Sequence, residues 1–262
     1  MSSLNKILLC HLFIILLVGS LFSPWTSIYW EKIDLASFHF LNRSLEIGKG
    51  WQLFWGFVNH RLHNWVEDLF FLGFFLLYIF QAPKEARLRA VSHCLFIVLF
   101  SSCIIYLVNC VLFRELFIFY RESPSLVTTS KILLSDKLPW LHIKESSYRS
   151  FPSDHGVTAL LFAFSYTYYS GWRLGRFAWG YAAFLCLPRL VIGAHWLSDI
   201  VVGSGSIALF FLSWIFFTPF YRACALPIEK GVAMLYISLS CLLTKCTNFL
   251  KKLTSSLPFS RC

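Results

Sequence analysis

Long apolar runs, separated by short charged stretches, limit what this chain can fold into more than any other feature. They predict helices over six ranges: 7–28, 66–81, 90–113, 153–170, 177–191 and 197–217. A helix of about 20 apolar residues crosses the bilayer core, so runs of this size favour membrane-spanning helices. Only 14% of the 262 residues are charged, against about 25% in a soluble domain. We therefore predict an all-α polytopic membrane protein, with a bundle of six transmembrane helices over residues 1–220.

The segments outside these runs carry aromatic and basic residues. Residues 29–65 alternate aromatic and charged side chains, which is typical of a helix lying at the membrane interface. The apolar run after Lys6 has no clear cleavage site, so we expect a retained first helix rather than a signal peptide. Basic stretches at 83–89 and 171–176 predict short turns. Residues 221–262 predict a basic cytoplasmic tail, whose short apolar run lies on the membrane surface or is partly disordered.

The net charge of +10 would suggest a nucleic-acid partner in a soluble protein. Basic loops beside an anionic bilayer explain it better here, because no basic helix with interleaved stacking aromatics is present. The nine cysteines include no Cys-x-x-Cys pair and predict neither a disulfide framework nor a metal centre. If the first helix leaves the cytoplasm, the external loop at 114–152 keeps six cations, against the usual preference for cytoplasmic cations. We expect some of these cations to bind an anion.

Two short polar runs, at 149–156 and 188–199, stand at the ends of apolar segments. An ionised side chain in or beside hydrocarbon costs about 2.5–3.5 kcal/mol on insertion scales, so such groups indicate function. Phosphoryl transfer needs cations and N–H groups around the phosphoryl oxygens, a nucleophile, and an acid for the leaving oxygen. The two runs supply candidates for each part, and we predict a phosphate site with His195 as the nucleophile.

His195 and Asp199 lie four residues apart, so in a helix they share a face. A carboxylate on one ring nitrogen fixes the tautomer and leaves the other nitrogen free and more basic, as a nucleophile or a base requires. An isolated salt link between the two is the alternative. Arg189 is expected to face the same pocket, because Gly193 lets the chain turn and a planar guanidinium suits a phosphate.

The run at 149–156 opens a predicted helix. Ser153 suits the N-cap and is a candidate phosphate ligand, and the free N–H groups of the first turn favour an anion. His155 is the candidate acid, a role that contributes roughly 10²–10⁴-fold in rate. A plain cap with an interfacial histidine is the alternative. Arg114 and Arg121 share a face if their helix continues, although an arginine that extends from a helix end to the interface has the same pattern.

These residues resemble the type 2 phosphatidic acid phosphatase superfamily, which carries three separated motifs. The third motif, Ser-Arg-x5-His-x3-Asp, is matched at Arg189, His195 and Asp199, with Pro188 where the family has serine. The second motif, Pro-Ser-Gly-His, is matched over residues 152–155 except at its glycine. Order, spacing and placement at helix ends all agree with the family over about 114–205, so the resemblance favours an enzyme.

The first motif, Lys-x6-Arg-Pro, is degraded in this chain. Arg121 fits its arginine, Arg114 stands at the lysine position, and Pro124 comes two residues late. Asp154 replaces the glycine of the second motif, and we expect it to position an acid or to pair with a cation such as Arg149. Further candidate site residues are thus Asp154, Arg149 and Gly156.

The resemblance implies a six-helix bundle with its site at the periplasmic helix ends and with neither metal nor cofactor. It implies a phosphohistidine on His195, a ring oriented by Asp199, and His155 as the acid. The side chains that would hold the phosphoryl oxygens, together with nearby N–H groups, are Arg121, Ser153, Arg189 and Arg114.

A narrower likeness, over 121–126, 150–156 and 188–204, is to lipid phosphotransferases that move a phosphate from undecaprenyl diphosphate to lipid A. It extends over all six predicted helices, including Asn42 and Asn59, but does not cover the tail beyond Phe220. It predicts a multi-pass protein of the bacterial inner membrane with lipid phosphate substrates and a site facing the periplasm. A phosphatase that passes the phosphate to water is the alternative. Two other classes stay open: a metal-dependent hydrolase with His155, His195 and Asp199 as ligands, and a membrane transporter or scaffold.

Overall fold

Helices make up the computed structural model, which describes residues 2–60, 63–116 and 119–256. The longer helices are α1 (Ser3–Phe22), α2 (Ser27–Arg43), α3 (Lys49–Val58), α4 (His63–Gln81), α5 (Arg87–Tyr106), α8 (Asp154–Ser170), α9 (Trp172–Val191), α10 (Gly205–Phe217) and α11 (Phe220–Ser256). The shorter pieces are η1 (Ser44–Ile47), η2 (Lys84–Ala86), η3 (Leu107–Leu116), α6 (Pro124–Val127), α7 (Leu134–Lys137) and η4 (Asp199–Ser204). The described residues contain no strand beyond isolated bridges, which confirms the predicted all-α class.

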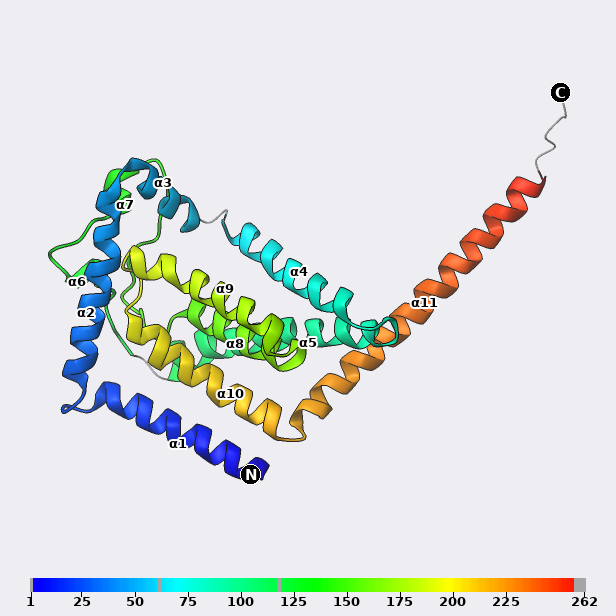
Figure 1. The fold of residues 1–262 in the computed structure, drawn as a ribbon, viewed down its shortest axis with the longest axis horizontal. Coiled ribbons are helices and arrows are strands. Elements are labelled where there is room, and N and C mark those ends of the chain that lie inside the picture. The colour runs from blue at the N-terminus through cyan, green and yellow to red at the C-terminus, as the bar shows by residue number, and fades with distance from the viewer. Residues whose placement is uncertain (1, 61–62, 117–118, 257–262) are drawn as a thin grey trace.

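The helices α8 and α9 form a hairpin inside a bundle that α1, α4, α5 and α10 complete (Figure 1). Small buried residues four apart, Ala159 and Ala163 on α8 and Ala178 and Ala182 on α9, are at most 3% exposed and allow a close approach. Aromatic side chains of α4, such as Phe71, pack against this hairpin. The buried core therefore lies along α8 and α9, and the loops lie at the two ends of the bundle.

Most predicted helices are confirmed, with shifted ends. The first stops at Phe22 rather than at 28, because Pro24 follows and a new helix begins at Ser27. The two predicted basic turns are mostly helical: Arg87 starts α5, and only Gly171, at φ +78°, separates α8 from α9. Basic residues that we expected in turns thus lie in the first turns of helices.

By length and apolar composition, four stretches of the described chain are able to cross a membrane: Ser3–Phe22, Lys84–Phe113, Asp199–Phe217 and Phe220–Asn248. These apolar helices are those of a membrane protein. Three of the four coincide with predicted spans, whereas α4, α8 and α9 are not among these stretches. The count of six spans therefore stays a prediction.

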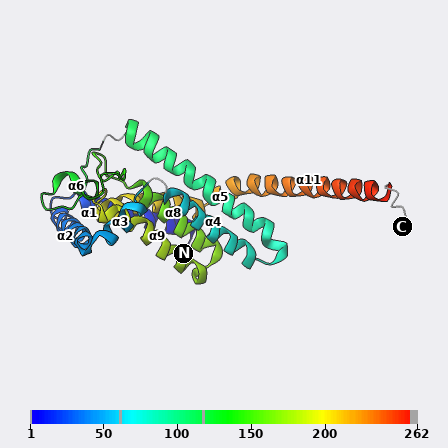
Figure 2. The same cartoon turned by 90° about the horizontal axis from the view of Figure 1, so that it is seen from above.

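The tail differs most from its prediction. The short apolar run that we expected at 232–243 is part of one continuous helix, α11, which projects away from the bundle (Figure 2). Its first turns pack on the bundle, where Ala225 and Ile228 contact the cluster around Phe96 and Ile215. The described side chains from Met234 onward are exposed. The helix continues because its sequence holds no glycine or proline after Gly231 until residue 258.

The helix α2 runs across the end of the bundle where α8 begins and α9 ends (Figure 1). Its buried residues, Asp34, Phe38 and Asn42, follow one face at intervals of four. Asn42 Nδ2 donates to the carbonyl oxygens of Val191, at 2.9 Å, and Ile132, at 3.0 Å. The described part of the interfacial segment predicted at 29–65 is thus mainly helical, and its first helix packs on the end of the bundle that carries the motifs.

Candidate active site

The three motif stretches are hydrogen-bonded to one another through the backbone. Ser150 N donates to Arg121 O at 2.8 Å, and Ser125 N donates to Gly193 O at 3.0 Å. Arg121 and Arg149 also form an isolated parallel bridge. Segments that lie far apart in the sequence are therefore held together at one end of the bundle. A shared phosphate site formed by the two polar runs needs this arrangement.

His195 lies in the turn between α9 and η4, where Gly193 takes a φ of +75°. Its Nδ1 lies 2.7 Å from the carbonyl oxygen of Ser150, which can only accept, so Nδ1 carries the proton. That tautomer leaves Nε2 with a free lone pair. Asp199 Oδ2 is 3.7 Å from the same Nδ1, so the orienting hydrogen bond comes from Ser150 and the carboxylate adds a charge behind the ring.

Asp199 is fully buried beside this turn. Its Oδ2 accepts from Trp196 N at 2.8 Å, and its Oδ1 accepts from Arg121 Nη1. A buried carboxylate needs such partners, because an isolated charge in the interior is costly. Asp199 is therefore held in one orientation next to His195.

His155 is held between Asp154 and Arg189. Its Nδ1 lies 2.9 Å from Asp154 Oδ1, and Arg189 Nη2 lies 2.8 Å from its Nε2. Since a guanidinium can only donate, Nε2 accepts and the proton of this ring lies on Nδ1. Asp154 Oδ1 is also 3.8 Å from His195 Nε2. The residue that replaces the family glycine thus lies between the two histidines, paired with His155 rather than with Arg149 or Arg121.

Ser153 caps α8, as predicted, with Oγ accepting from Gly156 N at 3.2 Å. It is fully buried, and its carbonyl accepts from Ser204 Oγ at 2.7 Å. A Cβ on Gly156 would lie 2.6 Å from Ser204 Oγ, so α8 and η4 pack closely at this point. Contact of Ser153 with a phosphate stays a prediction.

A cavity of about 750 Å³ opens onto both histidines. Its charged and titratable lining residues are His60, His142, Lys144, Arg149, Asp154, His155, Arg189 and His195. Arg149 Nη2 donates to Tyr120 OH at 3.0 Å and its guanidinium lies over that ring. Two of the cations expected to bind an anion, Lys144 and Arg149, are thus on the wall of the cavity.

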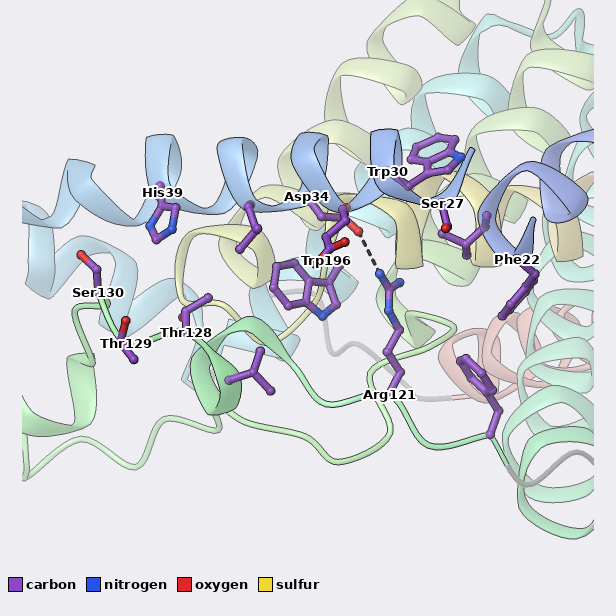
Figure 3. Close-up of a pocket in the computed structure, with 15 residues that line it drawn as sticks. Phe22, Ser27, Trp30, Asp34, His39, Arg121, Thr128, Thr129, Ser130 and Trp196 are labelled. Carbon is purple, nitrogen blue, oxygen red and sulfur yellow. Dashed lines mark hydrogen bonds and ion pairs between the residues drawn. The ribbon is translucent and has the colours of Figure 1, made fainter. Parts of the chain in front are cut away.

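Arg121 lies on the wall of a different cavity, of about 550 Å³, between α2 and the loop at 119–130 (Figure 3). Its Nη2 donates to Asp34 Oδ2 at 2.8 Å, and its Nη1 donates to Ser198 Oγ at 2.8 Å and to Asp199. Both arms of the guanidinium are therefore occupied by carboxylates in this structure. Its predicted phosphate contact stays a prediction, and the side chain of Arg114 lies outside the described residues.

Several residues around the site did not emerge from the motifs. Asp34 was missed, and its spacing of four with Phe38 on α2 was the only available signal. Asn42 and Asn59 entered only through the narrower likeness. Asn59 is 5% exposed, lines the larger cavity, and donates from Nδ2 to Trp55 O at 2.9 Å.

No group of three His, Cys, Asp or Glu side chains suited to a metal ion occurs among the described residues.

Residues 95–224 match the model of the PAP2 superfamily, and this range holds all three motif stretches. These matched residues, called the PAP2 domain here after the model that they match, run from α5 into α11. Lipid A 1-diphosphate synthase of Escherichia coli (strain K12) is 28% identical to the chain over 221 residues, which cover 83% of the chain and 90% of that protein. The resemblance inferred from the motifs is therefore confirmed. No solved structure gives a significant match. The PAP2 domain begins after α4, so α2 and Asp34 reach the site from outside it.

Proposed function

We propose that the chain is a lipid phosphotransferase that takes the terminal phosphate of undecaprenyl diphosphate and passes it to lipid A 1-phosphate. The observation that carries the proposal is the geometry of His195. Its Nδ1 faces Ser150 O, which leaves Nε2 unprotonated, and the side chain lines one cavity with Arg189 and His155. The similarity to lipid A 1-diphosphate synthase supports the choice of donor and acceptor.

In the first step, the lone pair of His195 Nε2 attacks the terminal phosphorus. An N–P bond forms, the P–O bond to undecaprenyl phosphate breaks, and the leaving oxygen takes a proton from His155. Arg189 turns from His155 Nε2 to a phosphoryl oxygen when substrate enters, which frees that nitrogen to take up a second proton from solvent and then to donate it to the leaving oxygen. Asp154, at 2.9 Å from His155 Nδ1, stabilises the protonated ring.

In the second step, an oxygen of the acceptor attacks the phosphohistidine. The N–P bond breaks, the phosphate moves to the acceptor, and His155 takes the proton when that oxygen carries one. The same arrangement serves a phosphate oxygen of lipid A or a water molecule. A lipid phosphate phosphatase is therefore the alternative, and Asp154, at 3.8 Å from His195 Nε2, lies where it would polarise an attacking water.

We propose that the site faces the periplasm from the bacterial inner membrane. The cations Lys84, Arg87, Arg173, Arg176 and Arg222 lie on connections or helix ends at the bundle end opposite the site (Figure 1). Cytoplasmic loops carry an excess of such residues, and this supports a site on the opposite, periplasmic side.

The decisive test uses purified protein and undecaprenyl diphosphate labelled on its terminal phosphate, with and without lipid A. We expect label on lipid A, and an acid-labile label on the protein when the acceptor is omitted. Label only in free phosphate would select the phosphatase. Equal label transfer by His195→Ala would contradict the proposed nucleophile.

Two controls accompany this test. His11→Ala, on α1 far from the cavity, should keep the wild-type rate. Chelation with EDTA should leave the rate unchanged, whereas loss of activity with rescue by zinc would favour a metal-dependent hydrolase.

A further inference from the structure

A buried carboxylate on α2 joins the site from outside the PAP2 domain. Asp34 is 2% exposed. Its Oδ1 accepts from Ser198 N at 2.8 Å, and its Oδ2 accepts from Ser198 Oγ and from Arg121 Nη2, at 2.8 Å for the latter. Burial raises the pKa of this carboxyl, while the Ser198 hydrogen bonds and the Arg121 charge oppose that rise.

The partners of Asp34 lead directly to the proposed nucleophile. Arg121 donates one arm of its guanidinium to Asp34 (Figure 3). It donates the other arm to Asp199 and to Ser198 Oγ. Asp199 then places Oδ2 at 3.7 Å from His195 Nδ1. Two carboxylates therefore share one guanidinium, and the second of them lies behind the reacting imidazole.

Stability alone gives a weak reason for this arrangement. A buried ion pair is often no more stable than a well-packed apolar replacement, because desolvation of the charges offsets their attraction. The cluster does, however, fix the orientation of the Asp199 carboxylate. With Oδ1 of Asp199 bound to Arg121, its Oδ2 is left for Trp196 N and for the side of His195.

We propose that Asp34 is a positioning residue for phosphoryl transfer at His195. It holds Arg121 and Ser198 so that Asp199 keeps its orientation and its negative charge behind the ring. The inference rests on the proposed function, and it adds to the PAP2 domain a carboxylate that lies 61 residues before the matched segment begins at residue 95.

The test is Asp34→Asn in the full-length, detergent-purified protein, with phosphate release or transfer from undecaprenyl diphosphate measured across pH. We expect kcat to fall roughly 10²-fold, because small displacements of a reacting group cost about that much. KM should stay unchanged, because Asp34 lines the smaller cavity, whereas His155 and His195 line the larger one.

The acid limb of the pH–rate profile should also move to lower pH. Removing one negative charge, and leaving Arg121 to act on Asp199 alone, disfavours a protonated imidazole at His195. Asp154 and Asp199 lie 3.8 and 3.7 Å from the ring nitrogens of His195. The other charged or titratable groups that line the same cavity are His155 from α8, Arg189 from α9, and His60, His142, Lys144 and Arg149, and all of these groups remain in the variant. A residue that only stabilised the fold would lower the amount of active protein without moving this limb.

Glu31→Gln is the matched control. Glu31 lies on the same helix and lines the same cavity, but it is exposed and makes no ion pair within the described part of the chain. It loses the same charge and should keep the wild-type kcat and pH profile.

Ser198→Ala is the second variant, in case Asp34→Asn does not fold. It removes only the hydroxyl between Asp34 and Arg121, and we expect a smaller shift in the same direction. Combined with Asp34→Asn, it should add little, because both act through one cluster.

The outcomes distinguish a failure of the proposed role of Asp34 from a failure of the proposed function. Suppose that the wild type is active and that Asp34→Asn keeps its kcat and the acid limb of its pH–rate profile. This result would overturn the role of Asp34 but not the proposed function, and Ser198→Ala serves in the same way if Asp34→Asn does not fold. A fall in kcat that matches a loss of folded protein, with an unmoved acid limb, would also overturn it. A wild type that neither releases nor transfers phosphate would overturn the proposed function itself.

Discussion

At the scale of single residues, Asp154 is the departure from the family pattern that the structure explains best. An anion beside a phosphate repels it unless the anion serves another group. Asp154 Oδ1 lies 2.9 Å from His155 Nδ1, and so it serves the proposed acid. The pair forms because both residues lie in the first turn of α8, on the rim of the larger cavity.

This contact predicts how variants of the acid behave. We expect His155→Ala to slow transfer by roughly 10²–10⁴-fold. Asp154→Ala should cost less, and it should add almost nothing in a His155→Ala background, because residues that act as a unit are not additive. Rates of the two single variants and the double variant check this. A full additional loss in the double variant would show that Asp154 acts on His195 instead, to which it is 3.8 Å distant.

At the scale of elements, the turn between α9 and η4 carries the site. Gly193 takes a φ of +75°, and a Cβ at this position would lie 2.6 Å from Phe38 Cε2 and 3.1 Å from Ser125 N. Both the backbone conformation and the close approach of α2 therefore require glycine here. The motif spacing pointed to a turn at this place, but it held no information about α2, which supplies Phe38.

Gly193→Ala should consequently lower both stability and activity. A strained backbone position costs on the order of 1–3 kcal/mol, and the contact with Phe38 adds to that. The matched control is Gly180→Ala in the middle of α9, where a Cβ meets nothing within 4 Å and a helical alanine is favourable by about 1 kcal/mol. Thermal unfolding in detergent should move in opposite directions for the two variants. A Gly193→Ala protein as stable as wild type would contradict the role of the turn.

At the scale of the whole molecule, the site and the tail lie at opposite ends of the bundle (Figure 1). The helix α11 is long and apolar enough to cross a membrane, yet it leaves the bundle at the far end and extends away from it (Figure 2). With the site on the periplasmic side, as proposed, α11 begins on the cytoplasmic side, and the cytoplasmic location of the tail stays a prediction.

Epitope tags test this arrangement. A tag inserted after Trp140, in the loop beside the site, should be accessible to antibody in intact spheroplasts. A tag after the last residue should become accessible only after lysis, because α11 stays on the cytoplasmic side. Accessibility of both tags in intact spheroplasts would instead mean that α11 crosses the membrane.

Much of the fold followed from local patterns. Apolar runs and their breaks predicted the helices α4, α5, α8, α9 and α10, since hydrophobicity and helix capping depend on neighbours in the chain. The cap at Ser153 was predicted for the same reason and is confirmed. The length of α11 was missed, because no local signal distinguishes a short surface helix from a long continuous one.

The sequence by itself determined the resemblance to the PAP2 superfamily and the residues that meet at the end of the bundle, because the order and spacing of the motifs can be read along the chain. Only the tertiary structure decided which group pairs with which. Arg121 joins Asp199 and Asp34, 78 and 87 residues away, and His195 Nδ1 takes the Ser150 carbonyl, 45 residues away, as its hydrogen-bond partner. Such pairings depend on distances set by the packing of α2 and the loop at 119–130 against the turn after α9, and no periodicity in the chain encodes those distances.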